Sequence, residues 1–142
     1  MMTLRQILIA YAGTSLVFLA LDAVWLTTMA DRLYRPALGA LMLERFVPLP
    51  AILFYGLYIV GIVVFAIAPS LTHGRWISAL WRGALLGLIA YATYDLTNQA
   101  TLRGWAWRVT VADLCWGTFV TAAAAAAGSK LTEWLGDGGA NG

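Results

Sequence analysis

Hydrophobic residues along this chain gather into four long stretches, at about residues 5–29, 48–68, 80–101 and 107–128, separated by short polar segments. The second stretch carries no charged residue over its 21 positions. A helix rises 1.5 Å per residue, so a stretch of that length covers about 30 Å, the thickness of the hydrocarbon core of a bilayer. The other three are of similar length and hold a few polar residues each. The pattern predicts four transmembrane helices.

Prolines and tryptophans mark the ends of these stretches. Pro48 and Pro50 suit the first turn of the second helix, where a missing amide proton costs nothing, and Pro69 suits its end. Indole side chains prefer the interface between membrane and water. Five tryptophans lie near the predicted ends of spans and are expected to anchor the helices there: Trp76, Trp81, Trp105, Trp107 and Trp134.

The composition supports the same class of protein. Hydrophobic residues make up 61% of the chain and charged residues only 11%, whereas about a quarter of a typical soluble domain is charged. The mean hydropathy is +0.77. At 142 residues, the chain has room for the four spans and for no soluble domain beside them. We therefore predict an all-α, polytopic integral membrane protein: a single four-helix transmembrane bundle over residues 1–135, followed by a flexible tail at 136–142.

Several kinds of chemistry are excluded by the residues that are scarce. The single cysteine, Cys115, excludes an internal disulfide and a multi-thiolate metal site. The single histidine, His73, excludes a haem held between two histidines of this chain. A net charge of +2 is too small to indicate nucleic-acid binding. No metal site is expected and no cofactor can be named, which leaves the lipid bilayer as the expected partner.

The connection between the first two spans, residues 31–47, allows two interpretations. Pro36 is placed to open a short helix that would lie in the membrane interface. The alternative is an ordinary loop with some hydrophobic contacts. In the helical interpretation, four residues form an apolar face and two turn toward water: Ala37, Leu38, Leu41 and Met42 against Glu44 and Arg45.

Small residues on the third and fourth spans predict close helix packing. Gly83 and Gly87 have the spacing of a GxxxG motif, and the run from Ala122 to Ala127 offers almost no side chain. Both surfaces suit packing within the bundle, which we favour, and both would also suit a homo-oligomer.

Three aspartates lie inside the predicted spans: Asp22, Asp95 and Asp113. An acidic residue at the centre of a membrane helix costs about 2.5 to 3.5 kcal/mol, so such residues are rare and are functional candidates by default. If the four helices alternate in direction, all three acids lie about 9 to 11 Å below the boundary opposite the N-terminus, at 1.5 Å per residue. Three helices would then bring an acid to one level.

Other polar and aromatic residues are expected near that level. On the third helix Tyr91, Tyr94, Asp95 and Asn98 share a face by the i, i+3, i+4, i+7 rule, and the second helix adds Tyr55. These positions predict a polar pocket that opens toward the side opposite the N-terminus. Five arginines lie on or near that side and are within reach as counter-charges: Arg32, Arg35, Arg45, Arg103 and Arg108.

A short pattern recurs on the first and fourth helices. Asp22-Ala-Val-Trp25 and Asp113-Leu-Cys-Trp116 are both Asp-x-x-Trp. Residues at i and i+3 share a helix face, so each indole N–H is placed to donate to a carboxylate on a facing helix while its ring shields the site from lipid.

Together with the stretch Tyr94-Asp95-Leu96-Thr97-Asn98, these two motifs resemble a family of small bacterial predicted membrane proteins with four helices and no assigned function. The resemblance extends over nearly the whole chain. It implies the four-helix fold, the importance of these positions and a bacterial cytoplasmic (inner) membrane location, but it supplies no activity.

Three functions are compatible with this pattern. We favour a protein that binds or transports a proton, a cation or an amphipathic small molecule at a site made of Asp22, Trp25, Tyr55, Tyr91, Tyr94, Asp95, Asn98, Asp113 and Trp116. The alternatives are a membrane-embedded enzyme acting on a lipid or isoprenoid, and an accessory subunit of a membrane complex. The acids could also serve only as hydrogen-bonding groups that hold the helices together.

The distribution of basic residues does not orient the chain. Four lie on the side of the N-terminus, namely Arg5, Arg75, Arg82 and Lys130, against the five arginines of the opposite side. This balance gives no positive-inside signal, so the compartment that the pocket faces is left open.

Overall fold

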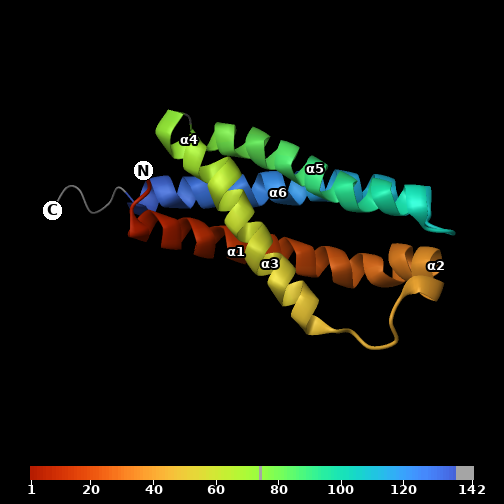
Figure 1. Ribbon diagram of the computed structural model, residues 1–142. Coiled ribbons are helices and arrows are strands. Elements are labelled where there is room, and N and C mark those ends of the chain that lie inside the picture. The colour runs from red at the N-terminus through yellow and green to blue at the C-terminus, as the bar shows by residue number, and fades with distance from the viewer. Residues whose placement is uncertain (74, 137–142) are drawn as a thin grey trace.

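The computed structural model describes residues 1–73 and 75–136 of the chain. Most of the predicted tail, 137–142, lies outside these residues, and Gly136 is the last residue of a helix rather than part of a tail. The described residues form helices joined by short turns (Figure 1). In order these are α1 (Leu4–Met29), the π-helical turn η1 (Ala30–Tyr34), α2 (Arg35–Leu38), the 3-10 turn η2 (Gly39–Leu41), α3 (Pro48–Ile62), the π-helical turn η3 (Val63–Ile67), α4 (Ala68–His73), α5 (Trp76–Thr101) and α6 (Trp107–Gly136).

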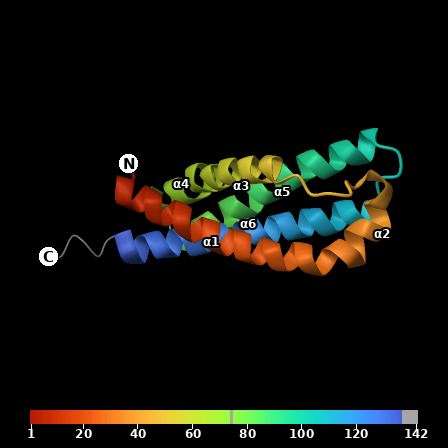
Figure 2. The same cartoon turned by 90° about the horizontal axis from the view of Figure 1, so that it is seen from below.

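These elements make four long helical rods that alternate in direction, which is the arrangement assumed above in comparing the depths of the three aspartates. Figures 1 and 2 show α1, α5 and α6 running along the length of the bundle, and Figure 1 shows α3 crossing them obliquely. The N-terminus and the end of α6 lie at one end of the bundle, and α2 lies at the other with the turn between α5 and α6. We call the latter the α2 end.

Three of the rods are long and apolar enough to cross a membrane: Leu4–Leu41, Pro48–Thr72 and Trp107–Gly136. The fourth, α5, is as long as α1 at 26 residues but more polar. Large apolar side chains cover the outside of the bundle, and Leu16, Leu57 and Phe65 are more than 60% exposed. Such a surface is suited to lipid rather than to water.

The rods extend beyond the predicted spans. Helix α5 begins at Trp76 rather than near residue 80, and α6 continues eight residues past Gly128 to Gly136. Pro48 and Pro50 occupy the first turn of α3, as predicted. Pro69 does not end the second rod, because η3 precedes it and the helix continues to His73. A wider π-helical turn accommodates a proline, which has no amide proton for the regular ladder.

A core of buried side chains fills the space between α1, α3 and α6. Phe18 is fully buried and packs edge-on against Tyr55 and Tyr58, with ring centroids 6.1 and 5.5 Å away. The Tyr58 hydroxyl hydrogen-bonds with the Thr121 hydroxyl at 2.8 Å. The rest of the buried cluster is made of Ala10, Ile62, Val63, Ala66, Ile67, Ala79, Val120, Ala124 and Ala125.

The small residues of α5 pack inside the molecule. A Cβ atom added to Gly83 would lie 2.7 Å from the Cβ of Ala125, and one added to Gly87 would lie 2.7 Å from the Thr121 hydroxyl. The GxxxG spacing therefore serves the contact between α5 and α6, the alternative that we favoured. Whether copies of the chain also associate through the Ala122–Ala127 surface stays a prediction.

The connection 31–47 begins as a continuation of α1. After η1 the chain forms α2, with Pro36 in its first turn, so the helical interpretation is correct for its first part. Ala37 and Leu38 pack against a small core formed by Leu33, Trp105 and Val109, whereas Leu41 and Met42 are exposed.

Trp105 was expected to anchor the interface and is instead 9% exposed. It follows Gly104, whose positive φ of 82° lets the chain turn tightly from α5 into α6. The indole N–H of Trp105 then donates to the Thr110 hydroxyl at 3.1 Å. The turn thus carries Trp105 inward, and the expectation of an interfacial anchor was wrong for this residue.

Candidate functional site

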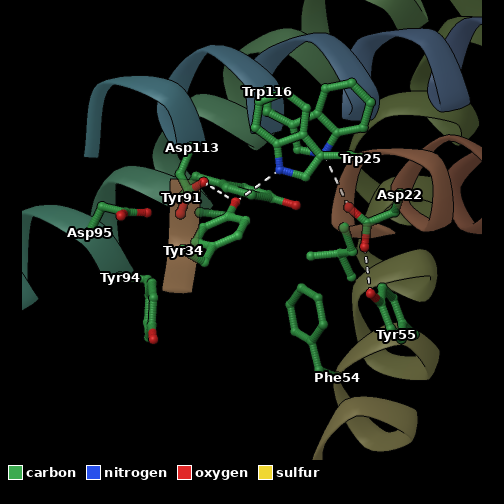
Figure 3. Close-up of a pocket in the computed structure, with 12 residues that line it drawn as sticks. Asp22, Trp25, Tyr34, Phe54, Tyr55, Tyr91, Tyr94, Asp95, Asp113 and Trp116 are labelled. Carbon is green, nitrogen blue, oxygen red and sulfur yellow. Dashed lines mark hydrogen bonds between the residues drawn. The ribbon is translucent and has the colours of Figure 1, made fainter. Parts of the chain in front are cut away.

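A cavity of about 410 Å³ opens in the half of the bundle nearer to the α2 end. Side chains from α1, η1, α3, α5 and α6 line it, including all three aspartates of the spans (Figure 3). Eight of the nine predicted site residues are present, together with four that were not predicted. The lining residues are Asp22, Trp25, Leu26, Tyr34, Phe54, Tyr55, Ala90, Tyr91, Tyr94, Asp95, Asp113 and Trp116. Asn98, the ninth predicted residue, is not among them.

Asp22 is held by two donors from other helices. The Tyr55 hydroxyl of α3 donates to one carboxylate oxygen, and the Trp116 indole N–H of α6 donates to the other at 3.0 Å. Asp22 is only 6% exposed. A buried carboxylate with a donor on each oxygen is well satisfied and joins α1, α3 and α6.

Asp113 is held through a tyrosine of the η1 turn. The Tyr34 hydroxyl donates to Asp113, and the oxygen of this hydroxyl accepts a hydrogen bond from the Trp25 indole N–H at 2.8 Å. The chain Trp25–Tyr34–Asp113 therefore connects α1, η1 and α6. Because Tyr34 both donates and accepts, it polarises both bonds in the same direction.

The two Asp-x-x-Trp motifs, one on α1 and one on α6, contact each other in the wall of the cavity. Trp116 donates directly to Asp22, as the pattern predicted, while Trp25 reaches Asp113 only through the Tyr34 hydroxyl. The indole rings of Trp25 and Trp116 stack with centroids 4.5 Å apart and an interplanar angle of 6°. Each motif thus supplies one indole ring of the stack and one aspartate of the cavity.

Asp95 differs from the other two acids. Its side chain is fully buried, and neither carboxylate oxygen has a hydrogen-bond partner among residues 1–73 and 75–136. Figure 3 shows the carboxylate pointing toward Asp113, while Tyr94, its neighbour in the sequence, turns away. A buried polar group without a partner costs about 1 to 3 kcal/mol, and more if it is charged. The burial of Asp95 is therefore costly unless a donor or a positive charge reaches its carboxylate.

Four other polar residues of the segment around Asp95 have hydrogen-bond partners. The hydroxyls of Thr93, Thr97 and Thr101 donate to backbone carbonyls of the preceding turn. Gln99 donates to the carbonyl oxygen of Trp105 at 3.1 Å and accepts from Thr110 at 3.0 Å, which ties the end of α5 to the start of α6. Asp95 is the exception in a segment whose other buried groups are accounted for.

The tyrosines of α5 form part of the cavity wall. Tyr91 lies against α6 at Gly117, where an added Cβ would fall onto the tyrosine ring. Tyr94 is 61% exposed and meets Trp105 edge-on, with centroids 5.7 Å apart. Glycine at position 117 therefore lets an aromatic ring of α5 approach the backbone of α6, beside the stacked tryptophans.

The expected arginine counter-charges do not reach the acids. Within the described part of the chain, the one ion pair joins Arg35 to Asp31 at 2.9 Å, and both side chains are well exposed. Among the described residues, no arginine or lysine lines the cavity. The described residues also contain no group of three histidine, cysteine or acidic side chains placed to ligate one metal ion. The cavity therefore combines acids with aromatic rings and carries no cation of its own.

Tyr34 gives a direct test of the hydrogen-bond network. Replacing it with phenylalanine should lower the free energy of unfolding by about 1 to 3 kcal/mol, because Trp25 loses its acceptor and Asp113 its donor. Thermal unfolding in a mild detergent measures the change. Tyr94→Phe is the matched control, since its hydroxyl makes no hydrogen bond with the described residues and it is largely exposed. Equal unfolding temperatures for the two variants would contradict the assigned network.

Sequence reasoning missed Tyr34 because it placed this residue in the connection rather than in a membrane helix. The structure carries the rod on through η1, and the extra residue of a π-helical turn alters the direction of the side chains that follow. The nine-residue spacing of Trp25 and Tyr34 offers no helical signal. The charged residues around Tyr34 (Asp31, Arg32 and Arg35) indicated a connection, so the sequence carried no signal for this contact.

The helical fold and the apolar exterior together define an all-α, polytopic integral membrane protein. Within that class, the chain belongs to the family described as Predicted membrane protein (DUF2177), whose model matches residues 7–130. The matched region contains all three cavity aspartates. No curated protein and no solved structure matches the chain.

Proposed function

We propose that this protein binds a cation, or the cationic group of an amphipathic small molecule, in the cavity around Asp95. The observation that carries the proposal is the Asp95 side chain, which is fully buried and has no partner among the described residues. A bound cation would offset the cost of that arrangement, because it brings a positive charge to a buried carboxylate that points toward a second one, that of Asp113.

The composition of the cavity supports a cation over an anion. Three carboxylates line it without an arginine or lysine. Seven of the twelve lining residues are aromatic, and the face of an aromatic ring attracts a positive charge by about 0.5 to 2 kcal/mol. A neutral ligand could fill the volume but would leave Asp95 without a compensating charge.

We further propose that all four rods cross the bacterial inner membrane, which would place the cavity within the bilayer. Helix α5 is the most polar of the four, but its threonine hydroxyls bond to its own backbone, Gln99 bonds to the α5–α6 turn, and Asp95 lines the cavity. A membrane helix tolerates polar residues that are satisfied in this way. Binding in this position would be the first step of any transport of the cation.

The test compares the native chain with two single-charge variants purified from the same membranes. Native mass spectrometry should find a discrete basic compound on the native protein and on Asp31→Asn, but not on Asp95→Asn. Asp31 is the matched control because it is an exposed acid outside the cavity, paired with Arg35. The same bound masses on all three proteins, or phospholipid alone on all three, would contradict the proposal.

A stability measurement on Asp95→Asn separates a binding role from a structural one. Asparagine keeps the shape of the side chain and removes the buried charge, so the unfolding temperature of the ligand-free protein should stay the same or rise. If the free energy of unfolding instead falls by about 3 kcal/mol or more, Asp95 is a group that holds the helices together.

A further inference from the structure

An apolar groove adjoins the aspartate cavity. It has a volume of about 480 Å³ and runs along α3 and η3, with one wall from α5. Its lining includes Leu57, Val60, Gly61, Val64, Phe65 and Leu86. Phe54 and Ala90 line both the groove and the cavity, so the two spaces are neighbours with shared walls.

We infer that the cavity and the groove together hold a single-chain primary amine, with its ammonium group at Asp95 and its alkyl chain in the groove. This inference rests on the proposed function, because it specifies the molecule that the cation-binding cavity takes. A polar cavity lined by acids and a neighbouring space lined by apolar side chains match the two ends of such an amphiphile.

The hydrogen-bonding state of Asp95 selects a primary amine. Both carboxylate oxygens lack a donor from the described residues. A primary ammonium brings three N–H donors, as a lysine side chain does, which is enough for both oxygens once the ligand displaces the side chains that cover them. A quaternary ammonium has the same charge but no N–H group, so it would leave the oxygens unpaired. Asp22 and Asp113 already receive donors from the protein and are less in need of one.

The dimensions of the groove indicate the length of the chain. From Phe54 to Phe65 the second rod advances eleven residues, which is about 16 Å at 1.5 Å per residue. An extended alkyl chain of about a dozen carbons has that length. The groove residues follow the second rod from Phe54 to Phe65, and Figure 1 shows this rod running toward α4, away from the α2 end. The amine would therefore lie as a lipid does, with its head near one membrane boundary and its tail toward the middle.

The charge of the cavity argues against a phospholipid head group as the occupant. A phosphate would lie close to three carboxylates, and no arginine or lysine lines the cavity to offset the repulsion. The amine of phosphatidylethanolamine is joined to such a phosphate, and the lipid carries two chains for one groove. An amine without a phosphate suits the cavity better.

Gly61 permits a variant that fills the groove without disturbing the fold. A Cβ atom added there would meet nothing within 4 Å, so Gly61→Leu should place its side chain in the groove without a clash. Gly39→Leu is the matched control, because an added Cβ at Gly39 also meets nothing within 4 Å and this residue lines neither the groove nor the cavity.

The experiment measures binding to the whole protein in nanodiscs of phosphatidylcholine, by native mass spectrometry and thermal shift. Dodecylamine should bind one per chain and at least about tenfold more tightly than dodecyltrimethylammonium or dodecanol, since an unpaired buried group costs about that factor. Asp95→Asn should abolish this preference. Gly61→Leu should weaken the binding of dodecylamine about tenfold or more. It should leave the binding of butylamine unchanged, because butylamine has no tail for the groove. Gly39→Leu should behave as the native chain.

The outcomes separate the inference from the proposed function. One outcome is that butylamine and dodecylamine bind with equal affinity, in a way that depends on Asp95 but is unchanged in Gly61→Leu. That result would support the cation site and overturn the assignment of the groove to an alkyl chain. If dodecyltrimethylammonium or phosphatidylethanolamine binds as tightly as dodecylamine, the assignment of a single-chain primary amine is overturned. If no amine binds in an Asp95-dependent way and no basic compound is found on the native protein, both proposals fail.

Discussion

Replacing Gly87 with valine should destabilise the protein by about 2 kcal/mol or more, because helices α5 and α6 are in backbone contact at this residue. An added Cβ would meet the carbonyl oxygen of Gly117 and would lie 2.7 Å from the Thr121 hydroxyl. A backbone carbonyl cannot rotate away, so the two helices must separate. Unfolding titrated with sodium dodecyl sulfate in mixed micelles, followed by circular dichroism, measures the loss.

The matched control for Gly87→Val is Gly61→Val on the second rod. Both are glycines inside helices, but an added Cβ at Gly61 meets nothing within 4 Å. The control should therefore keep the native stability within about 0.5 kcal/mol. If the two variants are equally stable, the close approach of α5 to α6 at Gly87 is wrong.

Truncating Phe18 to alanine should cost about 3 kcal/mol, since it leaves a cavity in the fully buried core. The loss should also affect the site. Phe18 packs edge-on against Tyr55, whose hydroxyl donates to Asp22. Without the Phe18 ring, the Tyr55 side chain is held less firmly in the position from which it donates. The unfolding titration described above measures the stability, and near-ultraviolet circular dichroism follows the packing of the aromatic rings.

Phe46→Ala is the control for the core truncation. Phe46 lies between η2 and α3 and is 78% exposed, so the same change of residue removes little packing within the chain. Its effect should stay within about 0.5 kcal/mol. A comparable loss in both variants would mean that Phe18 does not occupy the core described here.

The sequence predicted the four rods well, because long apolar stretches can only be satisfied as helices in a membrane. It predicted their ends poorly. Pro69 looked like a stop signal, yet η3 carries the helix past it. Trp105 looked like an interfacial anchor, yet the positive φ of Gly104 turns it inward. Both errors arise where a local backbone feature overrides the ordinary preference of a residue.

The sequence predicted which residues lie near the candidate site better than it predicted the hydrogen bonds between them. Helical spacing and depth identified Asp22, Asp95 and Asp113, and all three line one cavity. Pairing depends on rotation about helix axes and on side-chain direction, which spacing alone does not give. The sequence therefore could not show that Asp22 and Asp113 have donors while Asp95 has none. The arginines that we expected as partners lie outside the cavity lining for the same reason.

The stacked indoles of Trp25 and Trp116 give the cavity wall an optical signature. Two parallel chromophores whose centroids lie 4.5 Å apart couple their electronic transitions, so they absorb as a pair rather than as two independent rings. One ring belongs to α1 and the other to α6. The circular dichroism of that pair therefore reports on the separation of these two helices, and any occupant that wedges them apart would change the signal without an added label.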